Sequence, residues 1–341
     1  MAVNGFALRI DESSRTGEAR RRAAMLARQL GFTGSDCGAA GIIAAEAATN
    51  LLRHAGGGEM IAQPIALSPG VPALELIALD RGPGMRDVSR CMTDGFSTAG
   101  TLGGGLGAIK RLSTFFDIYS AEGGGTALAA CIAPNFAERP NRESPRGRAL
   151  CFGGVSAPKP GEEFCGDSWT VRTFNHACQA LIVDGLGHGF EANKAARAAL
   201  ETFNLSFGSP AMIIKEIHES LRPTRGAVGA VAEIDYIHAK VRFAGIGNIG
   251  AVIMSNQGNK RMVSHYGTLG HHLAKISEFA YDWPRDGCMV LHSDGLAARW
   301  NLDGYPGLAR HAPAITAAVL YRDFSRGNDD AAVVVIRSNT P

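Results

Sequence analysis

The sequence predicts a two-domain α/β protein, and three observations lead to this fold class. The chain has 341 residues, about twice a usual domain, and 45% of them are hydrophobic, so it can bury more than one core. The stretch 134–148, PNFAERPNRESPRGR, has three prolines, six charges and almost nothing to bury, which is typical of a linker. Helix-like and strand-like segments are mixed on both sides of it. We expect domains over residues 1–136 and 149–341, joined by a linker over 137–148.

The first domain is expected to begin with two helices and to continue with strands. TGEARRRAAMLARQLGF is helix-like, with Thr16 as its expected cap and Gly31 as its expected end. We expect Ser35 to cap a second helix, which ends at the glycines that start with Gly56. Apolar runs predict strands at 73–80, 115–121 and 125–133.

In the second domain, strands are expected to outnumber helices. A hairpin is predicted from the strands 169–174 and 178–184, and a helix follows from about Glu191 to Phe203. Further strands are predicted at 227–235, 240–247, 250–255, 287–294 and 331–337. This pattern favours sheets packed between helices.

Composition excludes several classes of protein. The 34 lysines and arginines nearly cancel the 32 aspartates and glutamates, so no whole-chain field favours nucleic acid or an anionic membrane. The seven cysteines are scattered without a CxxC pair, which is typical of a reducing compartment. The first residues lack a signal-peptide pattern, and no apolar run could cross a bilayer. We expect a cytoplasmic protein whose partner is a protein or a small molecule.

A Glu–Asn pair begins the chemistry of the first domain. Glu46 and Asn50 are four residues apart on a predicted helix, so their side chains share one face. A carboxylate there can take a proton from a hydroxyl, and an amide oxygen can bind magnesium beside a triphosphate. Taken alone, the pair is also typical of a solvated helix face.

Three glycine-containing motifs follow this pair. Asp80, at a predicted strand end, could accept a hydrogen bond from an exocyclic amine, and Gly82 and Gly84 let the backbone approach a flat ring. A later glycine run offers amide hydrogens to phosphates before a helix-like stretch, and a lysine there adds charge. That run and its lysine are Gly103, Gly104, Gly105, Gly107 and Lys110. Each motif alone could be an ordinary turn.

Together and in this order, the motifs resemble the GHKL (Bergerat) ATP-binding α/β sandwich, in the bacterial serine-kinase branch of anti-sigma factors and stressosome switch kinases. The resemblance covers roughly residues 5–134. It implies that Glu46 is the catalytic base, that Asn50 is the Mg²⁺ ligand and that Asp80 reads adenine. It further implies that GLGAIKRL is a lid over the phosphates and that Thr126 contacts the nucleotide.

Carboxylates beside predicted strand ends mark the second domain. They are Asp167, Asp184, Asp294 and the pair Asp329–Asp330. Converging strand ends would gather these acids, and close carboxylates repel unless cations neutralise them. Two divalent ions there could lower the pKa of a shared water and direct it at phosphorus. Oxygen ligands favour Mg²⁺ or Mn²⁺ over zinc. Each Asp-Gly alone is a common turn.

The ordered acids resemble the PPM-type metal-dependent phosphatases, an α-β-β-α sandwich, in their sporulation and stress-response branch, from about residue 150 to 338. By this resemblance Asp184 and the Gly185 carbonyl form the bridging metal site, Asp294 and Asp329 are further ligands, and Asp167 is an accessory acid. Asp184 and Asp294 would thus carry the catalysis. Two features bear on this assignment. Ala332 stands where the family usually has a hydroxyl residue, and His188 could protonate the leaving oxygen or be an ordinary surface residue.

The two resemblances together imply a bifunctional regulator. Its expected activities are an ATP-dependent serine/threonine kinase and a phosphoserine/phosphothreonine phosphatase that act on STAS-domain partner-switching proteins. The expected cofactors are ATP with Mg²⁺ in the first domain and two Mn²⁺ or Mg²⁺ in the second. Two alternatives stay open. The first domain could be a nucleotide-binding module that only sequesters a partner such as a sigma factor, or nucleotide could gate the phosphatase. The kinase branch also makes a homodimer an expectation.

Overall fold

The computed structural model describes residues 3–68, 71–92, 105–134, 150–174, 176–273 and 275–339. It divides into two compact units, Met1–Ser144 with Leu302–His311, and Pro145–Asn301 with Ala312–Pro341. Each unit combines helices with sheet, which confirms the predicted two-domain α/β class. Within the described ranges, none of the helices has the length and apolar character that a membrane span needs.

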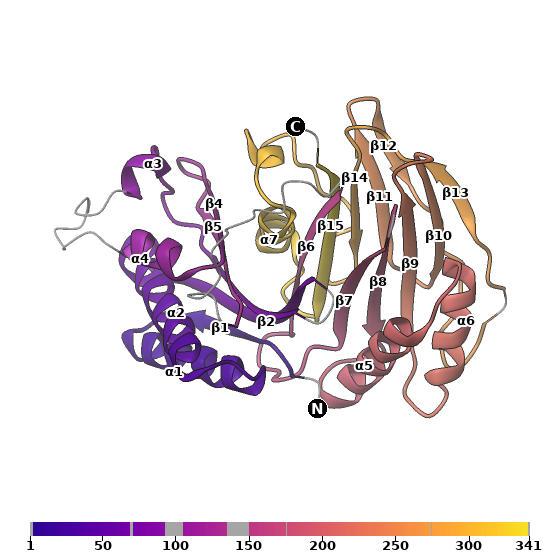
Figure 1. The fold of residues 1–341 in the computed structure, drawn as a ribbon, viewed down its shortest axis with the longest axis horizontal. Coiled ribbons are helices and arrows are strands. Elements are labelled where there is room, and N and C mark those ends of the chain that lie inside the picture. The colour runs from indigo at the N-terminus through magenta and orange to yellow at the C-terminus, as the bar shows by residue number, and fades with distance from the viewer. Residues whose placement is uncertain are drawn as a thin grey trace. The chain divides into compact units, whose positions relative to one another are not determined.

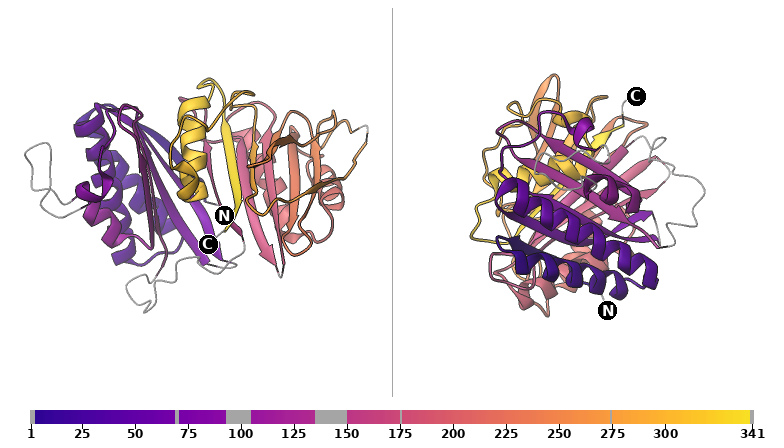
Figure 2. Two further views of the ribbon diagram at one scale, coloured as in Figure 1. Left: turned by 90° about the horizontal axis from the view of Figure 1, so that it is seen from above. Right: turned by 90° about the vertical axis from the view of Figure 1, so that its left-hand side faces the viewer.

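The first unit is a five-stranded antiparallel sheet with helices on one face (Figures 1 and 2). The strand order is β1-β2-β3-β5-β4. Alternate residues of β3 (Leu74, Leu76 and Ala78) join a core with helix residues such as Ile43 and Ala47. The strands are β1 (Phe6–Ile10), β2 (Gly58–Ser68), β3 (Val71–Leu79), β4 (Phe115–Ser120) and β5 (Thr126–Ile132). The helices are α1 (Ser13–Gln29), α2 (Gly34–Ala55), α3 (Val88–Cys91) and α4 (Gly105–Leu112).

Both predicted helix starts in this unit were wrong, whereas both ends are confirmed. Helix α1 begins one turn before Thr16, because Ser13 and the residues after it already take helical geometry. The α2 cap is Thr33 rather than Ser35, since the Thr33 hydroxyl accepts a hydrogen bond from the Asp36 amide. After each helix the chain turns through a glycine of positive φ, Gly31 (+82°) and Gly56 (+71°).

The described residues of the second unit form two five-stranded sheets and three helices. One sheet has the order β13-β10-β9-β8-β7, and the other has β12-β11-β14-β15-β6. The first comprises β7 (Asp167–Phe174), β8 (Ala177–Gly185), β9 (Ala227–Asp235), β10 (Lys240–Ile246) and β13 (Phe279–Asp282). The second comprises β6 (Leu150–Ala157), β11 (Gly250–Ser255), β12 (Gly258–Arg261), β14 (Cys288–His292) and β15 (Ala331–Ser338). The helices are α5 (Phe190–Leu205), α6 (Pro210–Ser220) and α7 (Pro313–Phe324); the 3-10 turn η2 (Leu308–Arg310), which precedes α7 in the sequence, belongs to the first unit.

These elements form an α-β-β-α sandwich, as predicted (Figure 1). Strand β8 shows how two cores arise from one strand, because its side chains alternate between faces. Ala180 and Ile182 face the core between the two sheets, with Val334 of β15. Leu181 and Val183 face a second core under α5 and α6, with Phe203. Helix α7 packs on β6 and β15 of the other sheet.

Candidate functional sites

A cavity of about 620 Å³ lies in the first unit between α2, the end of β3 and the start of α4. Six residues predicted from the sequence line it: Glu46, Asn50, Asp80, Gly84, Gly105 and Thr126. Its wall also includes the apolar Ala78, Ile118 and Leu128, and its basic residues are Arg53, His54, Arg86 and Arg90. Sequence reasoning missed both groups, because neither is marked by a motif. The volume is in the range of small-molecule sites.

One face of α2 supplies the polar end of this cavity. Glu46 and Asn50 lie one turn apart on it, as their spacing predicts. A Cβ atom at Gly105 would lie 2.9 Å from Glu46 Oε2 and 3.5 Å from Asn50 Oδ1, so both side chains converge on the first residue of α4. The buried Asn50 Nδ2 has no hydrogen-bond partner within the described residues. Such an orphaned amide is suited to a bound ligand.

Asp80 organises the opposite end of the cavity. Its Oδ1 accepts hydrogen bonds from the backbone N–H of Gly82 (2.8 Å) and of Thr126 (3.1 Å), which joins β3 to β5. Gly84 has φ +71°, and a Cβ there would lie 1.9 Å from the Ala121 carbonyl oxygen. A Cβ at Gly82 would lie 2.6 Å from the Ala55 Cβ. Both glycines are therefore required by close packing, and of the two only Gly84 lines the cavity.

The structure places the predicted lid residues differently from one another. Gly103 and Gly104 lie outside the described residues. Gly105 begins α4 and lines the cavity. Gly107 is buried within α4 and Lys110 is exposed on it, and neither belongs to the cavity wall.

In the second unit, the predicted acids lie at the ends of strands from both sheets. Asp167 begins β7 and pairs in register with Asp184, which is followed by Gly185 at the end of β8. Asp294 follows β14, and Asp329 and Asp330 precede β15, the neighbour of β14. Residues far apart in the sequence are thereby collected at the ends of the strands.

Burial and mutual repulsion raise the pKa of two of these carboxyls. Burial raises the pKa of Asp184 to about 7, with further repulsion from Asp294 and Asp329. Burial also raises the pKa of Asp167 well above its usual range, and the charge of Asp184 adds to this. The acids interact strongly, so ionising all of them requires a compensating positive charge.

Hydrogen bonds show which carboxylate oxygens already have a partner and which are available to a ligand. Both oxygens of Asp330 are occupied, because Oδ1 accepts from the Lys159 amide (2.7 Å) and Oδ2 from the Gly166 amide (2.8 Å). Asp294 Oδ2 accepts from Asn248 Nδ2 at 2.7 Å. The Asp167 Oδ2 atom is buried and has no partner within the described residues. Asp330 thus anchors the chain before β7, and Asp167 keeps an oxygen for a ligand.

The carboxylate and carbonyl oxygens of this site fit a hard divalent cation, although they do not converge on a single point. Within the described ranges, no three His, Cys, Asp or Glu side chains approach one another as a metal-holding group would. The raised pKa of Asp184 and the unpaired Asp167 oxygen are nevertheless the defects that a bound cation corrects. Carboxylate and carbonyl oxygens are the ligands that Mg²⁺ and Mn²⁺ take.

Neighbouring residues account for the two features that sequence analysis set apart. Ala332 has no hydroxyl, but Ser293, the residue after β14, supplies one, and its Oγ accepts from the Ala332 amide at 2.9 Å. The Ser293 hydroxyl also lowers the pKa of Asp167. His188 Nδ1 lies 2.7 Å from Glu162 Oε1, so a carboxylate holds the imidazole on the turn that follows Gly185.

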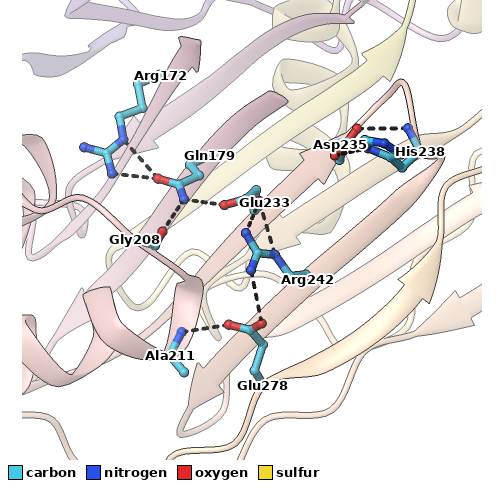
Figure 3. A network of polar contacts seen from close by, with 9 residues as sticks. All are labelled: Arg172, Gln179, Gly208, Ala211, Glu233, Asp235, His238, Arg242 and Glu278. Atoms are coloured by element: carbon cyan, nitrogen blue, oxygen red, sulfur yellow. Dashed lines mark hydrogen bonds and ion pairs between the residues drawn. The ribbon is translucent and has the colours of Figure 1, made fainter. Parts of the chain in front are cut away.

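A row of polar side chains crosses the helix-facing side of β7, β8, β9 and β10 (Figure 3). Arg172 donates to Gln179, Gln179 to Glu233, and Arg242 to Glu233. The row also binds the turn between α5 and α6, since Gln179 Nε2 donates to the Gly208 carbonyl at 2.8 Å. Helix α5 follows directly after the Asp184 turn, so the row fixes the helix that borders the acidic site.

Comparisons with known proteins place each unit. A model of the histidine kinase-like ATPase domain matches residues 11–132, and one of stage II sporulation protein E (SpoIIE) matches residues 175–339. The serine/threonine-protein kinase RsbT of Bacillus subtilis is 38% identical over 112 residues, which span 33% of this chain and 84% of RsbT. The phosphoserine phosphatase RsbX of the same organism is 24% identical over 144 residues, which span 40% of this chain and 70% of RsbX.

Among solved structures, one described under "The bacterial stressosome: a modular system that has been adapted to control secondary messenger signaling" is 28% identical, with a TM-score of 0.50. The match covers 56% of this chain and 100% of that one.

Proposed function

This chain belongs to the RsbT family through its histidine kinase-like ATPase domain, which a SpoIIE-type phosphatase domain follows, and from that premise we propose that it both phosphorylates and dephosphorylates a partner protein. The partner class we propose is a STAS-domain protein modified on serine or threonine. Support comes from the relatives, because RsbT is named a serine/threonine kinase, RsbX a phosphoserine phosphatase, and one similar structure belongs to the stressosome.

In the first domain we propose direct transfer from ATP. The substrate hydroxyl oxygen attacks the γ-phosphorus, the bond to the β–γ bridging oxygen breaks, and ADP leaves. Glu46 takes the hydroxyl proton, and Asp80 and Thr126 hold the base end of the nucleotide. Asn50 would hold Mg²⁺, which would neutralise charge on the phosphates. The convergence of Glu46 and Asn50 on Gly105, in one cavity with Asp80, is the observation that carries this proposal.

In the second domain we propose hydrolysis of the phosphoryl group. Asp184, the Gly185 carbonyl, Asp294 and Asp329 would hold two Mn²⁺ or Mg²⁺, with Asp167 as accessory acid. Bound ions would neutralise these acids and make a water nucleophilic near neutral pH. The chain's own residues keep that charge in place, because Asn248 orients Asp294 and Asp330 fixes the loop before β7. We further propose that His188, held by Glu162, gives a proton to the leaving oxygen.

The kinase is tested with a Glu46→Gln variant and radiolabelled ATP. We expect transfer to a STAS-domain partner to fall at least about 100-fold, since a positioned general base contributes that much, while nucleotide affinity is retained. Glu12→Gln is a matched control, because Glu12 is exposed, makes a surface ion pair of 3.8 Å with Arg15, and does not line the cavity. Nucleotide binding by the wild type without transfer to any such partner would instead support a binding module.

The phosphatase is tested with Asp184→Asn and Asp294→Asn in Mn²⁺-dependent hydrolysis of a phosphorylated partner. Both should lose activity. Asp235→Asn is the control, because Asp235 lies at the far end of β9 from the acidic site. Asp184 pairs with Val228 near the start of that strand, whereas Asp235 is its last residue. Full activity of either active-site variant would refute the assigned ligands.

A further inference from the structure

The acidic site poses a problem for its proposed substrate. A phosphorylated side chain is itself an anion, and the carboxylates of Asp184, Asp294 and Asp329 would offset much of the positive charge of the ions that they hold. A cationic side chain at the edge of the acids would favour its binding. We propose that Arg225 is that side chain and that its guanidinium binds the substrate phosphoryl group. This inference rests on the proposed phosphatase function and names a binding residue for it.

Arg225 lies against the turn that carries the first metal-site residues. Arg225 belongs to the loop from Leu221 to Gly226, between α6 and β9. The first residue after this loop, Ala227, pairs in register with Gly185. A Cβ atom built on Gly187 would lie 3.5 Å from Arg225 Nη1. The guanidinium is therefore beside the backbone two residues after Gly185. Gly187 is the residue before His188, the proposed proton donor.

The backbone beneath Arg225 is fixed from several directions. The Leu186 amide donates to the Gly226 carbonyl at 3.1 Å, which joins the loop to the Asp184 turn. The Thr224 hydroxyl donates to the Leu221 carbonyl (2.7 Å) and accepts from the Gly226 amide (3.0 Å). His271 Nε2 lies 2.9 Å from the Arg225 carbonyl oxygen. The loop backbone is therefore already ordered, and only the Arg225 side chain has to be ordered when a ligand binds.

The Arg225 side chain is exposed and has no carboxylate partner among the described residues, unlike a second arginine in the same loop. Arg222 is held by Glu219 through two hydrogen bonds, of 2.6 and 3.0 Å. His188, the nearest other basic group on the turn, is already paired with Glu162. A guanidinium fork matches two phosphate oxygens at once, which makes a free arginine well suited to this role.

The two arginines supply a variant and its matched control. We expect Arg225→Ala to raise both the KM for a phosphoserine peptide and the inhibition constant of inorganic phosphate by about 10- to 100-fold, the range of a charge-assisted hydrogen bond. Arg225→Lys should recover part of the loss, because lysine keeps the charge but not the fork. Arg222→Ala should match the wild type. Tryptophan fluorescence melts would verify that all variants are folded.

The inhibition constant of phosphate decides between phosphate binding and a looser role. If Arg225→Ala changes KM for the peptide but leaves phosphate inhibition unchanged, Arg225 contacts the protein part of the substrate and the proposal is wrong. If the wild type is active and Arg225→Ala has the same KM and the same phosphate inhibition constant, the assignment of Arg225 is wrong but the proposed phosphatase function stands. If the wild type hydrolyses no phosphorylated substrate, the proposed function fails first and the assignment falls with it.

Discussion

Replacing Asp184 with asparagine should make the metal-free second domain more stable, by an amount that grows with pH. The folded protein holds the pKa of Asp184 at about 7, against a usual value of 3.8. Between these two pH values the folded state binds the Asp184 proton more tightly than the unfolded state does. The free energy of unfolding is therefore higher at low pH and falls as pH rises. Each pH unit well below 7 costs about 1.4 kcal/mol and the slope halves at the folded pKa, so the loss is roughly 2 kcal/mol between pH 5 and pH 7.

Chelator-treated protein would be unfolded with urea at pH 5 and pH 7 and followed by tryptophan fluorescence. All three tryptophans, Trp169, Trp283 and Trp300, lie in the second domain, so the signal reports that domain. Asp235→Asn is a control with no slope in this range: hydrogen bonds from His238 lower the pKa of Asp235 from its usual 3.8, so this carboxyl is ionised in both folded and unfolded protein at pH 5 and pH 7. Equal pH slopes for wild type and Asp184→Asn would refute the proposed repulsion. Added Mn²⁺ should remove the wild-type loss.

Three further substitutions test particular contacts. Gln179→Ala should cost about 2–4 kcal/mol in urea unfolding, because it leaves several buried polar partners unpaired, whereas the exposed Gln257→Ala should cost nothing measurable. Gly84→Ala should lower nucleotide affinity by about 10-fold or more in fluorescent-nucleotide titrations, because its φ of +71° and the nearby Ala121 carbonyl leave no room for a Cβ. Ser293→Ala should cost about 1–3 kcal/mol in urea unfolding, since the buried Ala332 amide loses its acceptor.

Local sequence patterns were sufficient to predict the position of those site residues whose signal lies within one segment of the chain. Asp184 could be placed at a strand end because an apolar run leads into it and glycines follow. The same reasoning placed Asp80, and the helical spacing of Glu46 and Asn50 puts both in one cavity. In each of these cases one segment contains the signal, so no knowledge of distant residues was needed.

Elements without a periodic or apolar signature were missed. Strand β2 contains Gln63 and Pro64, which argue against a strand, but Pro64 lies beyond the end of the β1 pairing, which stops at Ala62. Strand β6 contains Gly153 and Gly154, which are needed because a Cβ at Gly153 would lie 2.5 Å from the Ala314 amide. Helix α7 is mostly apolar and shows no polar stripe, so its period is hidden.

The supporting residues of the sites could not be predicted for a different reason. Ser293 contacts Ala332, 39 positions away, and Asn248 contacts Asp294, 46 positions away. Arg225 reaches Gly187 from a different loop. No sequence motif around these three residues marks them. They become visible only when the strands are paired in register. Fold topology is therefore the information that the sequence motifs lack.

The central claim is that one chain adds a phosphate and also removes it. The most direct test follows one STAS-domain partner by intact mass spectrometry with ATP, Mg²⁺ and Mn²⁺. We predict that Asp184→Asn accumulates partner heavier by one phosphate, and that wild type added afterwards returns the mass to its starting value. Glu46→Gln should only dephosphorylate the product. Absence of any phosphorylated partner with Asp184→Asn, while wild type binds ATP, would contradict the account.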